Sequence, residues 1–225
     1  MRRRAALGLL AWLPATAGAQ QVLYEPQPPA GSAYLRVVNA TAAAIALRPA
    51  LTGPASLGVE PGQRIGPYAV QEAVAGRAVE FSVAAAAGGA AAQASLRLEP
   101  GSFNTLLVVA GASGLLLIPV MDQTQFNQTR ARLSFYNATP ACAGGGLILD
   151  PQGQAVFSDI EPGAARMRSV NPVSAQVRVA CGPGRSAPFA LGGMEPGGQY
   201  SVWMMAPDGQ PIGFMTRDTT TPWRR

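Results

Sequence analysis

The feature that most constrains the fold of this chain is an internal repeat. Residues 34–41 read YLRVVNAT and residues 132–139 read RLSFYNAT, so both stretches lead through a strand-like run into Asn-Ala-Thr. Two Glu-Pro-Gly motifs follow in each half, in the same order: at 59–62 and 98–101 in the first half, and at 160–163 and 194–197 in the second. Three matches in one order and at similar spacing indicate two copies of one structural unit.

Each copy carries the pattern of short β-strands. Residues 79–83 (VEFSV) alternate apolar and polar side chains, and residues 176–179 (QVRV) do the same at the equivalent place. Residues 103–109 and 199–205 are apolar-rich stretches that follow Pro-Gly turns. About seven or eight strands per copy at this spacing are typical of a sandwich, so we expect an all-β chain of two tandem β-sandwich domains.

One segment favours a helix locally. Residues 84–92 (AAAAGGAAA) are rich in alanine, the best helix former. Paired glycines interrupt the run, however, and strand patterns flank it on both sides. We therefore expect a hairpin here.

The start of the chain has the pattern of a secretory signal. Three arginines precede a short apolar stretch and the small-x-small sequence Ala-Gly-Ala at 17–19. The apolar stretch is shorter than the ~20 residues needed to span a bilayer, and no later run approaches that length. We expect cleavage after Ala19, export to the periplasm and no transmembrane segment in the mature chain. The expected organisation is a signal peptide (1–19), a proline-rich lead-in (20–32), a first β-sandwich domain (33–121), a second with its linker (122–218) and a tail (219–225).

Charge gives little support to a nucleic-acid partner. The chain has 17 basic residues against 12 acidic ones, and its formal net charge is +5. Three of the basic residues lie in the signal, so the mature chain keeps 14 against 12. No run of arginines alternates with aromatic residues, as a nucleic-acid surface would require.

The two cysteines are expected to pair. Cys142 and Cys181 are the only cysteines, and the chain has no histidine. In an oxidising compartment an even count favours a disulfide over a metal site or a reactive thiol. The cysteines also lack the close spacing of a zinc site. We expect neither a metal nor another cofactor.

The residues needed for common hydrolase or acyl-transfer chemistry are missing. A serine nucleophile needs a neighbouring base, and the chain has neither histidine nor lysine. A pair of carboxylates could catalyse hydrolysis without histidine or lysine. However, two glutamates in each copy directly precede Pro-Gly, and this recurrence favours a role in turns. The three Asn-x-Thr sequences match the glycosylation pattern, and we expect them to close strands instead. The residues considered are Ser32, Ser134 and Ser158, Glu60, Glu99, Glu161 and Glu195, and Asn39, Asn127 and Asn137. We expect no enzymatic activity.

Several short segments resemble one known family. The sequences LYEP at 23–26, LRVVN at 35–39 and SVNPV at 169–173 are similar to segments of the alginate biosynthesis protein AlgF family. This resemblance implies a non-enzymatic periplasmic adaptor that works beside a membrane acyltransferase and periplasmic transferases. The polymer that they O-acetylate would be alginate or a cellulose-like polysaccharide.

Four residues are candidates for contacts with a partner. Tyr24 and Trp223 are aromatic residues outside the repeats, where core packing explains them poorly. Arg36 and Asn171 are candidates through the resemblance alone. Trp203, on an expected strand, is assigned to the core. The alternative function is a stand-alone carbohydrate-binding or adhesive module.

Overall fold

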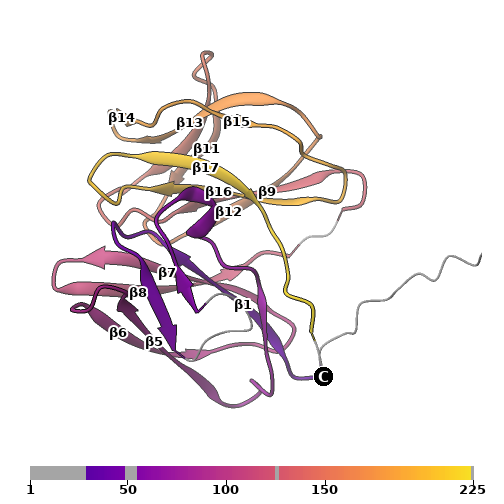
Figure 1. Ribbon diagram of the computed structural model, residues 1–225. Coiled ribbons are helices and arrows are strands. Elements are labelled where there is room, and N and C mark those ends of the chain that lie inside the picture. The colour runs from indigo at the N-terminus through magenta and orange to yellow at the C-terminus, as the bar shows by residue number, and fades with distance from the viewer. Residues whose placement is uncertain (1–28, 49–54, 125–126, 224–225) are drawn as a thin grey trace, which may run out of the picture.

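The alternating and apolar segments of the sequence form short strands in the computed structural model. The structure describes residues 29–48, 55–124 and 127–223. In these ranges the chain forms strands and one short 3-10 helix, η1 (Pro61–Gln63). The described residues contain no helix that is long and apolar enough to span a membrane. The strands make four sheets, two for each sequence repeat (Figure 1). The prediction of two all-β sandwiches is confirmed.

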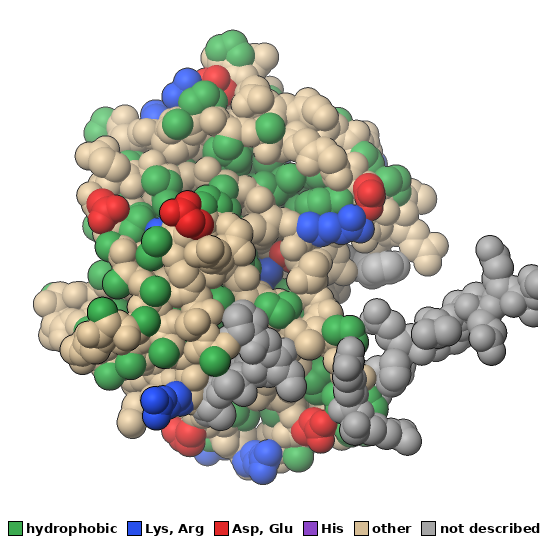
Figure 2. Space-filling model, viewed as in Figure 1, with side chains coloured by type: hydrophobic (Ala, Val, Ile, Leu, Met, Phe, Trp, Pro, Cys, Tyr) green, Lys and Arg blue, Asp and Glu red, His purple; other side chains and the backbone are tan. Residues whose placement is uncertain are grey.

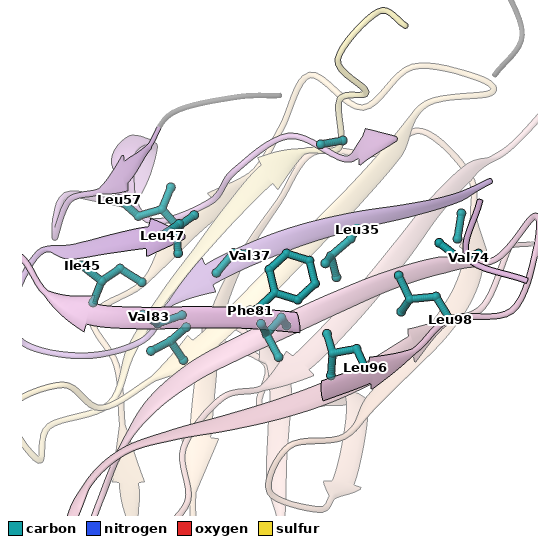
Figure 3. Close-up of a cluster of buried hydrophobic side chains, with 14 residues drawn as sticks. Leu35, Val37, Ile45, Leu47, Leu57, Val74, Phe81, Val83, Leu96 and Leu98 are labelled. Atoms are coloured by element: carbon teal, nitrogen blue, oxygen red, sulfur yellow. The ribbon is translucent and has the colours of Figure 1, made fainter. Parts of the chain in front are cut away.

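The first domain is a sandwich of two four-stranded sheets with the orders β4-β1-β7-β8 and β3-β2-β5-β6. Side chains of the two sheets point toward one another and form its core (Figure 3). Leu35 from one sheet and Ile45 from the other are fully buried there. The strands are β1 (Ala33–Asn39), β2 (Ile45–Arg48), β3 (Ser56–Leu57), β4 (Ala69–Gln71), β5 (Ala78–Ala85), β6 (Ala91–Arg97), β7 (Phe103–Gly111) and β8 (Gly114–Asp122).

The second domain repeats this plan. Its sheets have the orders β12-β9-β16-β17 and β11-β10-β13-β14, with β15 also paired to β13. A second core lies between them, with Phe135 and Val179 at 0% exposure. The strands are β9 (Ala131–Asn137), β10 (Gly145–Leu149), β11 (Ala155–Ile160), β12 (Ala165–Val170), β13 (Ala175–Cys181), β14 (Gly184–Arg185), β15 (Phe189–Leu191), β16 (Gln199–Met205) and β17 (Ile212–Arg217).

Strand register shows that the two domains are copies of each other. In the first domain β1 and β7 are parallel, with Tyr34 opposite Phe103. In the second domain β9 and β16 are parallel, with Arg132 opposite Gln199. In both domains the other pairs of the corresponding sheets are antiparallel. Hence β1 corresponds to β9, β7 to β16 and β8 to β17.

Two of the three Asn-x-Thr asparagines close strands, as predicted, whereas Asn127 lies in the loop between β8 and β9. Asn39 and Asn137 are both 0% exposed at the ends of β1 and β9. Each side-chain amide donates to backbone carbonyls of the following segments, and each amide oxygen accepts the N–H of the threonine two residues later. The carbonyls belong to Ala43, Leu57 and Gly58 for Asn39 and to Cys142 and Ile160 for Asn137.

The glutamates before Pro-Gly belong to turns. In all four motifs the glutamate carbonyl accepts a backbone N–H three residues later, which closes the turn. The acceptors and donors are Glu60 and Gln63, Glu99 and Ser102, Glu161 and Ala164, and Glu195 and Gly198. The recurrence of these residues in both copies therefore reflects backbone geometry.

The alanine-rich segment is a hairpin, as predicted. β5 and β6 pair antiparallel, and the N–H of Ala85 donates to the carbonyl of Ala90 at 2.8 Å. Gly88 and Gly89 in the turn have φ values of 87° and 98°. Residues with a Cβ rarely adopt such angles, so the paired glycines determine where the chain reverses.

A third core joins the two domains. The outer face of sheet β4-β1-β7-β8 packs on the outer face of sheet β12-β9-β16-β17, which makes four stacked layers. The strands in the two middle layers are therefore buried on both faces. The expected boundaries shift slightly as a result: β8 includes Asp122, which was assigned to the second domain, and the expected tail is hydrogen-bonded to the first domain through Thr219 and Thr221.

Candidate functional site

The interface between the domains is built from equivalent residues of the two copies. We call it the seam. At its apolar positions the first domain contributes the smaller side chain and the second the larger one, except for one pair of alanines, and all these residues are buried. The equivalent pairs are Val38 and Tyr136, Ala40 and Ala138, Leu107 and Trp203, and Val109 and Met205. Trp203 is 0% exposed, as the sequence predicted for a core residue.

Arg36 occupies the polar part of the seam. Its side chain extends from β1 into the second domain and is 1% exposed. The guanidinium carbon lies 4.3 Å from the ring centre of Tyr68 and 4.8 Å from that of Trp203, so aromatic rings surround the charge. All three nitrogens donate: Nε to Thr105 (2.9 Å), Nη1 to Asp218 (2.7 Å), and Nη2 to Tyr136 (2.9 Å) and Ser201 (3.1 Å).

Two aspartates at equivalent positions balance the charge in this network. Asp122 ends β8, and Asp218 directly follows β17. Each accepts a hydrogen bond of 2.7 Å from a hydroxyl on the neighbouring strand, Thr105 for Asp122 and Ser201 for Asp218. Arg132 adds a second cation, 3.2 Å from Asp218. Two arginines and two aspartates therefore leave the network close to neutral.

The oxygens of both carboxylates are occupied by neighbours within the chain. Asp218 accepts from Arg36 and Ser201 through Oδ1 and from Arg132 through Oδ2. Asp122 accepts from Tyr136 through Oδ1, and from Thr105 and Tyr68 through Oδ2. The hydroxyl-bearing residues Thr105 and Ser201 are 0% exposed. The arrangement can hold two domains together, but it offers no accessible nucleophile.

Burial shifts the pKa values of the charged and phenolic groups in the seam. Desolvation raises the pKa of Tyr68 and of Tyr136 well above the usual value, because the ionised phenolate would lose its water. Burial by itself lowers the pKa of Arg36, but its neighbours, chiefly Tyr136 and Asp218, raise it well above the ordinary value. Arg36 therefore stays charged and the two tyrosines stay neutral at physiological pH.

The C-terminal segment links the domains a second time. After β17 the chain crosses back to the first domain (Figure 1), where the N–H of Tyr68 donates to Thr219 and the N–H of Thr221 donates to Tyr68. The indole N–H of Trp223 donates to Glu72 at 2.7 Å. We call residues 218–223 the strap.

The structure divides the sequence-based contact candidates between interior and surface. Arg36 is an internal link, so the expectation that its side chain meets a partner is wrong. Asn171 lies in an exposed loop between β12 and β13, next to Val173, which is 51% exposed. Trp223 is partly buried in the strap, and Tyr24 lies outside the described residues.

The predicted disulfide is present within the second domain. Cys142 and Cys181 are bonded, with their Cα atoms 5.7 Å apart. Cys142 is 0% exposed and belongs to the core of that domain. Of the serines considered earlier, Ser32 and Ser134 are buried and Ser158 is exposed. The described ranges hold no cluster of three or more Cys, Asp or Glu residues that could bind a metal ion.

Sequence reasoning missed the acidic half of the network. Asp122 was assigned to a linker and Asp218 was not singled out. The repeat contained the signal, because the two aspartates stand at matching positions opposite Phe103 and Gln199. No pattern in the sequence indicated that Arg36 would reach across the seam to Asp218.

A polar cavity of about 230 Å³ opens at one end of the seam. Both domains and the strap line it, with aromatic residues from the first domain and polar ones from the second. Its residues are Tyr68, Phe103, Gly197, Gly198, Gln199, Arg217, Asp218 and Thr220. A larger cavity of about 450 Å³, near Cys181 and Pro211, is lined mainly by small and apolar residues.

No protein-family model matches the chain, and no curated protein does either. The function is therefore inferred from the residues and their geometry.

Proposed function

We propose that this protein is a non-enzymatic periplasmic adaptor that supports the O-acetylation of an exported polysaccharide. The observation that carries the proposal is the Arg36 network, in which the buried acids, hydroxyls and cations bind one another across the seam. Such a network fixes the relative placement of two domains. The similarity of segments 23–26, 35–39 and 169–173 to the AlgF family supplies the pathway.

A fixed two-domain body suits an adaptor for a physical reason. A partner bound to one domain is held at a set distance from a partner bound to the other. This raises the effective concentration of each for the other. A flexible pair of domains would lose part of that gain because the encounter would cost more entropy. An acetyl donor and its transferase are the partners that the family resemblance implies.

The charges on the visible face also agree with a protein-binding role rather than a nucleic-acid one. On the face shown in Figure 2, basic and acidic side chains are scattered singly, without a continuous patch of one sign. The disulfide fits an oxidising compartment such as the periplasm. The loop with Asn171 and Val173 exposes an amide and an apolar side chain together, so we assign it as a contact for an acetyl-transfer partner.

The proposal is tested in the organism and with purified protein. Deleting the gene should reduce polymer acetylation while leaving polymer synthesis largely intact. The purified protein should show no turnover of an activated acetyl ester. Asn171→Ala combined with Val173→Asp should weaken copurification with the transferase components, whereas Gln93→Ala on exposed β6 should not. Normal acetylation in the deletion strain would remove the pathway assignment, and turnover abolished by one Ser→Ala change would remove the adaptor role.

A further inference from the structure

The polar cavity at the end of the seam is lined by equivalent residues of different chemistry. Phe103 and Gln199 are equivalent residues, since each is the first residue of its parallel strand. The apolar residues of the seam come from both sheets. At this end an aromatic residue of the first domain and an amide residue of the second line the same cavity. The sequence repeat does not explain this change.

The first-domain wall of the cavity is aromatic. Phe103 stacks on Tyr34, with ring centres 4.3 Å apart and planes 10° apart, and meets Tyr68 edge to face at 5.0 Å. These contacts fix the ring of Phe103, which remains partly exposed to the cavity. An aromatic ring held in this way offers a flat apolar surface at low cost in conformational entropy.

The second domain and the strap add hydrogen-bonding groups to the lining of the cavity. Among the described residues no hydrogen bond involves the side chain of Gln199 or Thr220. The backbone holds both residues in place, since the carbonyl of Gln199 accepts the N–H of Asp218 and Thr220 bridges to Tyr68 of the first domain. Arg217 adds a guanidinium that is paired at 2.8 Å with Glu195 and is 58% exposed. Charges around the cavity therefore balance, and the available donors and acceptors belong mainly to neutral groups.

We propose that this cavity binds one six-membered sugar ring of a polysaccharide. A sugar ring has C–H groups that pack on an aromatic surface and hydroxyls at its rim that bond to amide, hydroxyl and guanidinium groups. The cavity is lined by both kinds of group. Its volume of about 230 Å³ lies below the roughly 300 Å³ at which sites for drug-sized ligands begin, so it suits a single ring.

The ring can be neutral or acidic, since the balanced charges do not select between the two. An acidic ring would place its carboxylate near Arg217, in competition with Glu195. A neutral ring would use Gln199 and Thr220 alone. This inference goes beyond the adaptor role because it gives the chain its own contact with the polymer. It does not depend on acetylation.

The test measures binding of two probes to the mature protein by ligand-observed NMR and calorimetry. The probes are a glucose oligomer and a mannuronate oligomer. We expect at least one to bind, and we expect Gln199→Ala to weaken it by about fivefold or more, as the loss of one ligand hydrogen bond predicts. Gln176→Ala, on the exposed face of β13, is the matched control and should leave affinity unchanged.

Each outcome decides the proposal. Binding of the glucan alone assigns a neutral ring, binding of the mannuronate alone assigns an acidic ring, and binding of both assigns recognition by ring shape. Binding of neither probe overturns the proposal. So does binding that Gln199→Ala and Thr220→Ala both leave unchanged, because the sugar would then lie elsewhere. Both side chains lack hydrogen bonds to described residues, so these variants are expected to fold, and the melting temperature checks this.

Discussion

Arg36 in the first domain donates a hydrogen bond of 2.7 Å to Asp218 in the second, although 182 positions separate them in the sequence. Both side chains are at most 3% exposed. The pair joins the sheet that contains β1 to the sheet that contains β17. Thr105, Ser201 and Tyr136 accept the other hydrogen bonds of Arg36. The link between the domains is thus a charged one within an otherwise apolar interface.

Replacing Arg36 should destabilise the whole molecule. Arg36→Met removes one of the two cations paired with the buried Asp218 and leaves Arg132 alone beside it. Removing one member of a buried ion pair typically costs about 3–5 kcal/mol. Urea unfolding followed by circular dichroism measures this loss. Arg97→Met on exposed β6 is the control and should change stability by less than about 0.5 kcal/mol. Equal effects of the two variants would contradict the role given to Arg36.

The repeated asparagines provide a comparison within one motif. Asn39→Ala and Asn137→Ala each remove a fully buried amide that donates to backbone carbonyls, which should cost about 1–3 kcal/mol. Asn127→Ala alters the same Asn-x-Thr sequence at an exposed site, where, among the described residues, the side chain bonds only to Thr129, and should be nearly neutral. Thermal unfolding of the three variants tests the order. A loss at Asn127 as large as at Asn39 would show that burial is not the cause.

The disulfide should stabilise the second domain. It joins residues 39 positions apart, and closing a loop of this size contributes up to about 4 kcal/mol in the chain-entropy model. The double variant Cys142→Ala/Cys181→Ala should therefore unfold at lower urea concentration than the parent protein. Thiol titration of the denatured, non-reduced parent should find no free thiol. One free thiol per chain would contradict the intramolecular bond.

Alkaline pH should unfold the protein through its buried tyrosines. Burial raises the pKa of Tyr68 and Tyr136 above the unfolded value of about 10. Below pH 10 or so both states keep the phenolic protons; above it the unfolded chain loses them while the folded chain retains them, so stability falls as pH rises. The chain has no lysine and no free cysteine that could titrate in the same range, so the tyrosines dominate the change in stability above pH 10 or so.

The measurement is urea unfolding at a series of alkaline pH values, with tyrosinate absorbance recorded on the folded protein. Tyr68→Phe should make the decline with pH shallower, although it also removes a hydrogen bond to Asp122 and lowers stability overall. Constant stability above pH 10 or so, or ionisation of all the tyrosines of the folded protein near that pH, would contradict the prediction.

The sequence by itself determined the local structure of each domain. Alternation in segments such as 79–83 predicted strands, and the paired glycines of 84–92 predicted a hairpin over the helix that alanine favours. The repeated Asn-Ala-Thr and Glu-Pro-Gly motifs predicted strand ends and turns. These features follow from interactions between residues close in the chain. The even cysteine count also predicted one long-range contact, the disulfide between Cys142 and Cys181.

Only the tertiary structure decided how the two copies meet. Alternation shows that a strand has two different faces, but it does not show whether an outer face meets water or another sheet. The unbroken apolar run at Leu106–Val109 hinted at burial on both sides. The place of Arg36 was beyond sequence reasoning, because a lone arginine on a strand is usually solvated. Its burial depends on Asp218, Tyr136 and Ser201, which the fold brings from another domain to within hydrogen-bond distance.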